Sequence, residues 1–386
     1  MFLIILVLLL TLTVADWTTP VKVIPAYKDS FSIFTDDSNG VSHVFWCNNI
    51  DLNFNYRRFY PNNTLSPIQV FEWEQPCNRS YVIKGAHDGK SLYLVFQGSR
   101  KRVIGGSCET DSNKCHDIFF SESINGGETW SKPKAVPRND MADKRDRQYP
   151  DLIVTVEKRL WIFYRMQGLI NSLLAHAMRT PGTSDFYNEY IHPIQVDTFS
   201  LKYAVNENTR TLSIFYMKQD DNDKFHYYTE NNGISWRGPF NVTNSCDNDT
   251  IVKLPFSSDL SLPFAFFVCE NEKPEKYLRI MVTPSTWTDV VLPKYTYTDH
   301  FTIPGDNNKK AVVAYCYNTV YYLPIDEKEF KKTIKPPTPN NEECKMITSS
   351  YKLKHFWYWY VTYNANNTMS LWSTSIPFDE SILNHQ

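Results

Sequence analysis

Two short segments with the same pattern of turn residues constrain this chain more than any other feature. Residues 123–130 and 229–236 each combine a hydroxyl residue, an asparagine, a glycine and a closing tryptophan. Asparagine and glycine adopt the positive φ angles of tight hairpins, and serine or threonine hydroxyls bind the turn backbone. The tryptophan covers the hairpin with a large apolar face. Two such hairpins, about one hundred residues apart, indicate a repeated β unit.

Seven short apolar runs rich in β-forming residues recur along the chain. Their spacing is about 45 to 70 residues, the size of a four-stranded propeller blade. The sequence therefore predicts an all-β propeller of four-stranded antiparallel blades, with seven blades favoured. Six blades are the alternative, because residues 31–71 would then help to complete the blade that closes the ring near 371–376. The runs are residues 41–46, 92–96, 160–164, 212–216, 264–268, 311–315 and 356–360.

A further strand is expected after three of these runs. Residues 117–123 and 225–229 lead into the two hairpins, and residues 278–282 lead into a weaker copy at 283–287. Residues 170–178 are expected to form either such a strand or a short helix in its place. Because no linker interrupts the series, residues 16–386 are predicted to be a single domain.

The composition is that of a globular chain built mainly from strands. Of 386 residues, 42% are hydrophobic and 15% are aromatic, and tyrosine and phenylalanine prefer strands. The formal net charge of −2 gives no overall field that would attract nucleic acid or an acidic membrane surface. No cysteine spacing suits a zinc site, and no motif indicates a cofactor. A charged partner would therefore have to meet a local cluster.

Residues 1–15 form an apolar run interrupted only by Thr11 and Thr13. Its length suits a secretory signal peptide cleaved near Ala15, although no lysine or arginine precedes it. An uncleaved short anchor is the alternative. A membrane span needs about 20 apolar residues, and no later segment supplies one. We therefore expect a secreted protein without a membrane span.

Cysteines and glycosylation sequons agree with export. The cysteine count of 8 is even, and the order suggests local bridges, although eight cysteines allow about 105 pairings. The suggested pairs are Cys47 with Cys77, Cys108 with Cys115, Cys246 with Cys269, and Cys316 with Cys344. The Asn-x-Ser/Thr sequons predict glycosylated surface loops, and they begin at Asn62, Asn78, Asn241, Asn248 and Asn366.

The pattern Ser/Thr-x-Asp/Asn-x-Gly-x-Thr/Ser-Trp in both hairpins resembles the Asp box, or BNR repeat, of the sialidase superfamily. In that family the box is a structural hairpin of a β-propeller, and it occurs in enzymes and in non-enzymatic binding proteins. The sialidase enzymes have six blades. The resemblance implies structural roles for Ser123, Asn125, Gly127, Thr129 and Trp130, and for Thr229, Asn231, Gly233, Ser235 and Trp236.

Strand order assigns the loops to two rims. If the boxes join the third and fourth strands of a blade, they lie on one rim, because connections alternate between the ends of an antiparallel sheet. Residues 97–116, 138–149, 165–171, 218–224 and 270–276 then lie on the other rim, where sialidases hold their substrate. The loops 97–116 and 138–149 together form the densest charged patch in the chain. This patch suits an acidic sugar, because guanidinium groups bind carboxylates through paired hydrogen bonds. A solvated loop with self-neutralising charges is the alternative. The predicted ligand-binding residues are Arg100, Arg102, Arg145 and Arg147.

The resemblance also implies a catalytic set of three arginines, a tyrosine nucleophile polarised by a glutamate, and an aspartate acid/base. The sequence departs from the family's pattern in several places. Arg79 lies within the Asn78 sequon and is not followed by Ile-Pro, Gln97 replaces an acid, and no glutamate partner is identifiable. The candidates by motif position and chain order are Arg79, Arg100, Asp111, Arg165 and Tyr351.

These observations predict a secreted, disulfide-bonded glycoprotein that binds carbohydrate, including sialylated glycans, on the rim opposite the Asp boxes. One alternative is a divergent exo-α-sialidase. Another is a protein-binding propeller, for which a flat aromatic rim without a charged pocket would be expected. The predicted partner is a glycan or glycoprotein, with no cofactor, no metal and no nucleic acid, and the oligomeric state is left open.

Overall fold

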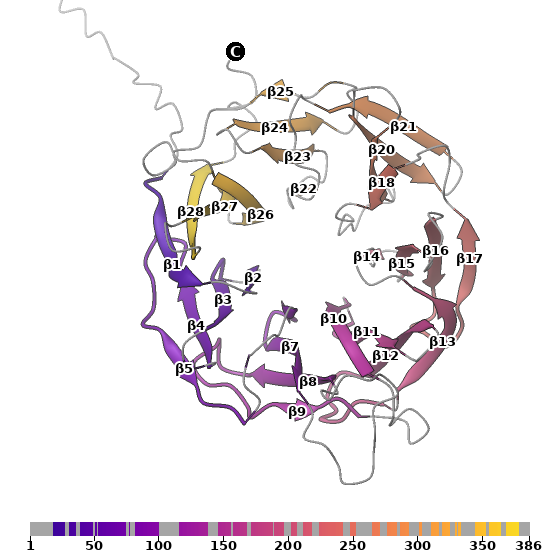
Figure 1. Ribbon diagram of the computed structural model, residues 1–386, viewed down its shortest axis with the longest axis horizontal. Coiled ribbons are helices and arrows are strands. Elements are labelled where there is room, and N and C mark those ends of the chain that lie inside the picture. The colour runs from indigo at the N-terminus through magenta and orange to yellow at the C-terminus, as the bar shows by residue number, and fades with distance from the viewer. Residues whose placement is uncertain are drawn as a thin grey trace, which may run out of the picture.

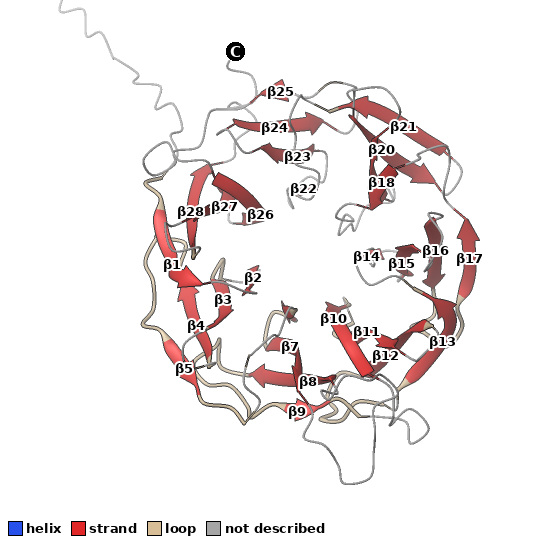
Figure 2. Cartoon of the chain, viewed as in Figure 1, coloured by secondary structure: helices blue, strands red, loops and turns tan. Residues whose placement is uncertain are grey.

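Every regular element in the described part of the protein is a β-strand (Figure 2). Those residues contain no helix, and so none that is long and apolar enough to cross a membrane. The prediction of an all-β chain is confirmed. The computed structural model describes residues 18–27, 31–35, 39–48, 51, 53–74, 77, 82–99, 116–137, 146–155, 157–167, 171–187, 189–196, 202–206, 211–217, 224–241, 248–251, 265–270, 276–283, 286–292, 301–302, 310–315, 319–324, 329, 331–332, 344–352, 355–363 and 368–377.

The described strands form seven four-stranded antiparallel sheets arranged around a common centre (Figure 1). We number the sheets along the chain. Sheet 1 holds β2 (Phe31–Thr35), β3 (Ser42–Cys47), β4 (Phe54–Phe59) and β5 (Gln69–Phe71). Sheet 2 holds β6 (Ile83–His87), β7 (Leu92–Ser99), β8 (His116–Ser123) and β9 (Lys134–Ala135), and sheet 3 holds β10 (Asp146–Val154), β11 (Leu160–Gln167), β12 (Ser172–Arg179) and β13 (Tyr190–Gln195).

The remaining sheets follow the same spatial order of strands. Sheet 4 holds β14 (Lys202–Asn206), β15 (Thr211–Met217), β16 (Lys224–Thr229) and β17 (Arg237–Asn241). Sheet 5 holds β18 (Asn248–Ile251), β19 (Ala265–Glu270), β20 (Lys276–Thr283) and β21 (Thr286–Val291). Sheet 6 holds β22 (Phe301–Thr302), β23 (Lys310–Tyr315), β24 (Thr319–Pro324) and β25 (Lys331–Lys332), and sheet 7 holds β26 (Cys344–Lys352), β27 (His355–Tyr363), β28 (Met369–Pro377) and β1 (Val21–Tyr27).

Each predicted apolar run overlaps the second strand of a sheet, so the strand predictions are confirmed. The short helix considered for residues 170–178 is wrong, because residues 172–179 form β12. This strand pairs without interruption with β11, from Leu160 opposite Arg179 to Gln167 opposite Ser172. The ladder supplies hydrogen-bond partners for the backbone N–H and C=O groups of β12, so these groups do not need the internal hydrogen bonds of a helix.

Sheet 7 joins the two ends of the described chain. Its fourth strand is β1, which pairs antiparallel with β28, from Val21 opposite Ser373 to Tyr27 opposite Met369. Just before β1, the Thr18 amide donates a 2.7 Å hydrogen bond to the Ser375 carbonyl. Residues 31–71 form a complete sheet of their own, so they take no part in this closing sheet, contrary to the alternative considered from the sequence.

The described hydrophobic core lies between neighbouring sheets. Alternate residues of β11 enter different clusters: Ile162 and Tyr164 pack toward sheet 2, whereas Trp161 and Phe163 pack toward sheet 4. All four are at most 1% exposed. A strand buried on both faces needs an unbroken apolar run rather than alternation, which explains the pattern at residues 160–164.

The first Asp-box hairpin is held by its own side chains. The Ser123 hydroxyl donates to the Asn125 Oδ1 over 2.9 Å and accepts from the Gly127 amide, also over 2.9 Å. The Thr129 amide donates to the same Asn125 oxygen over 3.0 Å. Residues at the equivalent positions of the second hairpin, Thr229, Asn231, Gly233 and Ser235, make the same three bonds at 2.9 Å each. Local side-chain bonds of this kind stabilise a tight turn.

Each Asp-box tryptophan packs against the preceding sheet. Trp130 meets Phe45 of sheet 1 edge to face, with ring centroids 4.9 Å apart. Trp236 meets Trp161 of sheet 3 edge to face at 6.1 Å. The boxes therefore join neighbouring sheets, as well as turning the chain within one sheet.

Candidate functional site

The order of the strands separates the two rims. The Asp-box turns join third to fourth strands, β8 to β9 and β16 to β17. Because neighbouring strands are antiparallel, the end of each second strand and the start of each first and third strand lie at the opposite rim. This opposite rim includes the end of β7, the starts of β8 and β10, and the end of β11. We call it the open rim.

A polar cluster joins sheets 2 and 3 at the open rim. The Asp146 carboxylate, at the start of β10, accepts hydrogen bonds from the His116 amide over 2.5 Å and from the Gln148 side-chain amide over 2.5 Å. The His116 Nδ1 lies 3.1 Å from the Asp146 Oδ2. The imidazole is 23% exposed, whereas the carboxylate is 2% exposed. A buried carboxylate therefore orients a histidine that reaches the surface.

The neighbouring backbone is strained. Tyr149 has a φ of 53°, a left-handed conformation that is rare for a bulky residue, and it precedes Pro150. The Tyr149 amide donates a 3.0 Å hydrogen bond to the Gln97 side-chain oxygen at the end of β7. Backbone strain of this kind costs on the order of 1–3 kcal/mol and is concentrated at functional sites. Gln97 thus supports the strained residue from the adjacent sheet.

Arg147, predicted to bind ligand, is completely buried between sheets 2 and 3. Its Nη2 lies 2.8 Å from the Glu189 Oε1, and its Nη1 lies 3.3 Å from the Asp117 Oδ1. The same guanidinium donates to the Val136 and Pro137 carbonyls over 2.8 Å each. In this structure the side chain is an interior ion-pair partner, and its predicted ligand-binding role stays a prediction.

The Arg147 network also contains a tyrosine–glutamate pair. The Tyr164 hydroxyl donates a 2.6 Å hydrogen bond to the Glu189 Oε1, and the Arg147 guanidinium lies over the Tyr164 ring. Burial raises the pKa of Tyr164 well above its usual value. Because Tyr164 and the Glu189 side chain are both inaccessible to solvent, this pair cannot act on a substrate.

Two other predicted catalytic residues lie at opposite rims. Arg165 is near the end of β11, opposite Gln148 of β10, and is therefore at the open rim. Tyr351 is near the end of β26, opposite Phe356 of β27, next to the turn that joins these strands. A turn between the first and second strands lies on the Asp-box rim. The strand order thus separates Tyr351 from Arg165.

The remaining predicted arginines and aspartate lie outside the described residues, as do several cysteines and sequons. Arg79, Arg100, Arg102, Asp111 and Arg145 are in this group. So are Cys108, Cys115, Cys246, Cys316, Asn78 and Asn366, together with the side chains of Cys269, Cys344 and Asn248. Asn62 and Asn241 are described and exposed, as sequon asparagines must be to carry a glycan. The described residues contain no group of three or more side chains suited to holding a metal ion.

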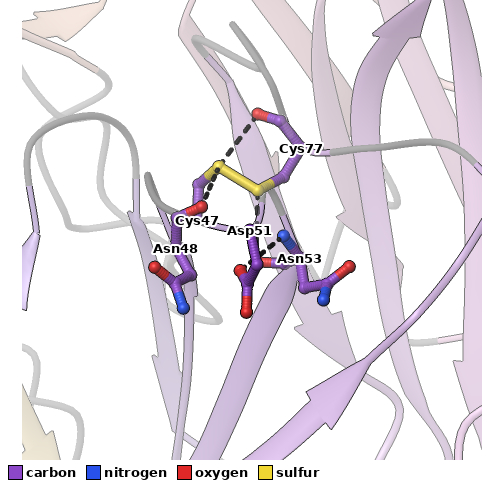
Figure 3. Close-up of a disulfide and its surroundings, with 5 residues drawn as sticks. All are labelled: Cys47, Asn48, Asp51, Asn53 and Cys77. Carbon is purple, nitrogen blue, oxygen red and sulfur yellow. Dashed lines mark hydrogen bonds between the residues drawn. A yellow bond between two sulfur atoms is a disulfide. The ribbon is translucent and has the colours of Figure 1, made fainter.

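One predicted disulfide is confirmed. Cys47 and Cys77 are bonded, with their Cα atoms 5.5 Å apart (Figure 3). Cys47 ends the second strand of sheet 1, and Cys77 precedes the first strand of sheet 2. The bridge therefore fixes the connection between these sheets at the open rim. Close to it, the Asn53 amide donates a 3.1 Å hydrogen bond to the Asp51 carboxylate (Figure 3).

Sequence reasoning did not identify the cluster of His116, Asp146 and Gln148. It placed His116 and Tyr149 in open-rim loops without giving either a role. The available signal was positional: Asp146 and Gln148 flank the charged Arg147 immediately before Tyr149-Pro150. That signal could not show that His116, 30 residues earlier, contacts Asp146.

The chain matches no protein-family model and no curated protein. Solved structures do resemble it. The polysaccharide lyase Uly1 aligns with a TM-score of 0.60 at 8% identity, over 92% of this chain and 91% of that chain. A polysaccharide lyase described as a PL25 ulvan lyase aligns with a TM-score of 0.57 at 7% identity, over 92% of this chain and 95% of that chain.

A sialidase aligns less closely. Trypanosoma rangeli sialidase in complex with sialic acid gives a TM-score of 0.47 at 12% identity, over 89% of this chain and 59% of that chain. This alignment supports no statement about activity. The identities show a shared fold alone. The shared fold is carried by the two polysaccharide lyases, whose TM-scores are 0.60 and 0.57.

Proposed function

We propose that this protein is a secreted glycoprotein that binds carbohydrate on its open rim. In this proposal residues 1–15 are a cleaved signal peptide, and residues 16–386 form one seven-bladed propeller. The pairing of β1 with β28 supports a closed ring, because it joins the strands that begin and end the described fold. The disulfide and the exposed sequon residue Asn62 support passage through an oxidising, glycosylating compartment.

The single observation that carries the binding proposal is the cluster of His116, Asp146 and Gln148 beside the strained Tyr149. Sugar recognition uses a small number of fixed hydrogen-bonding groups, together with aromatic surface. The buried Asp146 holds the side chains of His116 and Gln148 in defined positions. Their orientation is therefore set before a ligand arrives, which lowers the entropy lost on binding.

The chain order adds positive charge to this cluster. Arg100 directly follows the last residue of β7, and Arg145 directly precedes Asp146. Guanidinium groups favour a carboxylate-bearing sugar over a neutral one. We therefore propose an acidic glycan, such as a sialylated or uronate-containing chain, as the ligand.

A glycan panel tests this proposal. We expect the secreted protein to bind acidic glycans, and we expect His116→Ala and Gln148→Ala to weaken binding by about tenfold or more each, as loss of a charged or well-oriented hydrogen bond does. Ile234→Ser is the matched control, because Ile234 is 86% exposed in the second Asp box on the other rim. Equal loss in the control, or no binding to any glycan by folded protein, would contradict the proposal. The second result would favour the protein-binding alternative.

Polysaccharide cleavage is a second candidate, favoured by the contact between His116 and Asp146. A histidine oriented by a carboxylate is suited to taking a proton from a substrate. Fold likeness to polysaccharide lyases is consistent with this candidate but does not carry it. Formation of an unsaturated uronate from acidic polysaccharides, abolished in His116→Ala, would support it. Absence of product from protein that binds the same polysaccharide would leave a binding protein.

The exo-α-sialidase alternative needs a separate assay. Hydrolysis of a fluorogenic sialoside should be compared between the unmodified protein and its Arg100→Ala, Arg165→Ala and Tyr351→Phe variants. The strand-order separation of Tyr351 from Arg165 argues against a shared pocket. We therefore expect no turnover that depends on Tyr351. Turnover abolished by Tyr351→Phe would overturn this expectation.

A further inference from the structure

Two buried histidines form a direct hydrogen bond at the junction of sheets 3 and 4. The Nδ1 of His176, in β12, lies 2.8 Å from the Nε2 of His192, in β13. His192 is inaccessible to solvent, and His176 is 7% exposed. A hydrogen bond between two ring nitrogens needs one N–H donor and one lone pair. The contact therefore cannot persist when both imidazoles are protonated.

The pair continues across the sheet boundary. The other ring nitrogen of His192, Nδ1, lies 3.4 Å from the Tyr227 hydroxyl of β16 in sheet 4. Trp236, which ends the second Asp box, stacks on Tyr227 and meets His192 edge to face, with centroids 4.9 and 4.8 Å apart. Protonation of the pair would therefore disturb both the bond and the aromatic packing that join the two sheets.

The described neighbours of the two imidazoles are mainly aromatic rings. The titratable groups that face the two imidazoles are Tyr190 of β13 and Tyr227 of β16, and β11 contributes the Trp161 and Phe163 rings. The contacts of the two imidazoles in the described structure include no carboxylate. On the same face of β12, the Arg159 Nη1 lies 3.7 Å from the Met178 sulfur.

We propose that His176 and His192 form an acid-sensitive latch that loosens the junction between sheets 3 and 4 as the surroundings become acidic. Neutral imidazoles keep the junction closed. Opening breaks the shared hydrogen bond, and proton uptake by the exposed imidazoles then keeps the two strands apart from Tyr227 and Trp236. This device is independent of whether the open rim binds carbohydrate.

The direction of the effect follows from the pKa values. Burial lowers the pKa of His176 to about 3 and also lowers the pKa of His192, which the neighbouring His176 lowers further. An exposed histidine has a pKa of about 6.5, so the opened junction takes up protons first as the pH falls. Closure is complete above about pH 6.5 and weakens below it. From pH 7 to pH 5, opening should increase about 25-fold for one histidine and several hundred-fold for both.

Hydrogen–deuterium exchange of the full-length protein tests the latch. After correction for the intrinsic exchange rate, we expect amides of β12, β13 and β16 to lose protection between pH 7 and pH 5, while β27 and β28 of sheet 7 stay protected. The His176→Gln/His192→Gln variant keeps hydrogen-bonding side chains but cannot titrate there, and its β12 and β13 should lose this pH dependence. Strand β16 keeps a buried histidine of its own, His226. His87→Gln, a partly exposed histidine of sheet 2, is the matched control and should behave like the unmodified protein.

Two results would overturn the proposal. One is full protection of β12, β13 and β16 at pH 5 in the unmodified protein. The other is unchanged acid opening in the double variant. If the double variant does not fold at pH 7, the unmodified protein still decides the matter, because two-proton uptake predicts that opening rises by up to about 100-fold per pH unit below pH 6. A slope near zero contradicts the latch.

Discussion

Gly127 of the first Asp box lies directly against the Tyr56 hydroxyl of the neighbouring sheet, so that a Cβ atom at Gly127 would stand 1.9 Å from that oxygen. The Tyr56 hydroxyl is itself fixed by the His43 Nδ1 at 2.7 Å. The glycine therefore satisfies two needs, a left-handed turn with a φ of 83° and close contact between sheets. Gly233 repeats the relationship, with an added Cβ only 2.3 Å from Trp161.

Gly127→Ala should destabilise the protein by about 2–4 kcal/mol, because backbone strain and overpacking of the core add. Gly126→Ala is the matched control, since Gly126 has a φ of 66° but no atom within 4 Å of an added Cβ. We expect the control to lose about 1 kcal/mol from strain alone. Urea unfolding measures both values. Equal losses in the two variants would show that the contact with Tyr56 adds nothing.

Breaking the buried ion pair of Arg147 should be more damaging. Arg147→Met leaves the Glu189 carboxylate, which is inaccessible to solvent, without its cation, and we expect a loss of about 3–5 kcal/mol. Arg147→Met/Glu189→Gln should recover part of this loss, because no unpaired charge stays buried. The free energy of unfolding checks both variants.

The control for that prediction is an exposed pair. Arg237 Nη2 lies 3.4 Å from Glu230 Oε2, and the two side chains are 63% and 46% exposed. Arg237→Met should change stability by at most about 1 kcal/mol, because water screens the pair. A loss from Arg147→Met that is no greater than the loss from Arg237→Met would show that Arg147 is not a structural ion-pair partner. Its predicted role in ligand binding would then be the better explanation.

Removing the disulfide between Cys47 and Cys77 should also reduce stability. The bridge closes a loop of sequence separation 30, for which chain entropy gives a stabilisation of about 3–4 kcal/mol. Cys47→Ser/Cys77→Ser should therefore lower the denaturant midpoint, and mild reduction of the unmodified protein should do the same if this bridge is accessible to the reductant. An unchanged midpoint in the double variant would contradict this prediction. It would mean that the bridge does not lower the conformational entropy of the unfolded chain enough to affect stability.

Asn62 is expected to carry an N-linked glycan. It lies exposed in the turn after β4, and its Oδ1 accepts hydrogen bonds from the Thr64 amide over 3.2 Å and from the Thr64 hydroxyl over 2.7 Å. These bonds leave the Asn62 side-chain nitrogen available for a glycan. Asn62→Gln should lower the mass of the secreted protein by one glycan and change stability by about 0.5 kcal/mol or less. Thr64→Ser keeps the sequon, and its mass should fall only by the lost methylene group.

Much of the strand architecture could be predicted from the sequence. The run at residues 160–164 identifies a doubly buried strand because both faces need apolar residues. The Asp-box hairpins are equally local, since Ser123, Asn125 and Gly127 bond within one turn. By contrast, β1 was not predicted. Within β1, the Pro25 carbonyl accepts a hydrogen bond from the Ser370 hydroxyl, 345 positions further along the chain. No local sequence pattern encodes so distant a partner.

The sequence by itself determined the all-β class, the second strand of each sheet and the turn chemistry, because these depend on side-chain period and backbone preference over a few residues. Only the tertiary structure decided that Arg147 is enclosed by Asp117 and Glu189, and that Asp146 faces His116 at the surface. Asp146 and Arg147 are adjacent in the sequence, whereas His116 and Asp117 lie 30 residues before them and Glu189 follows only after β11 and β12. Their different environments arise when sheets 2 and 3 pack together, because the packing decides which side chains lose contact with water.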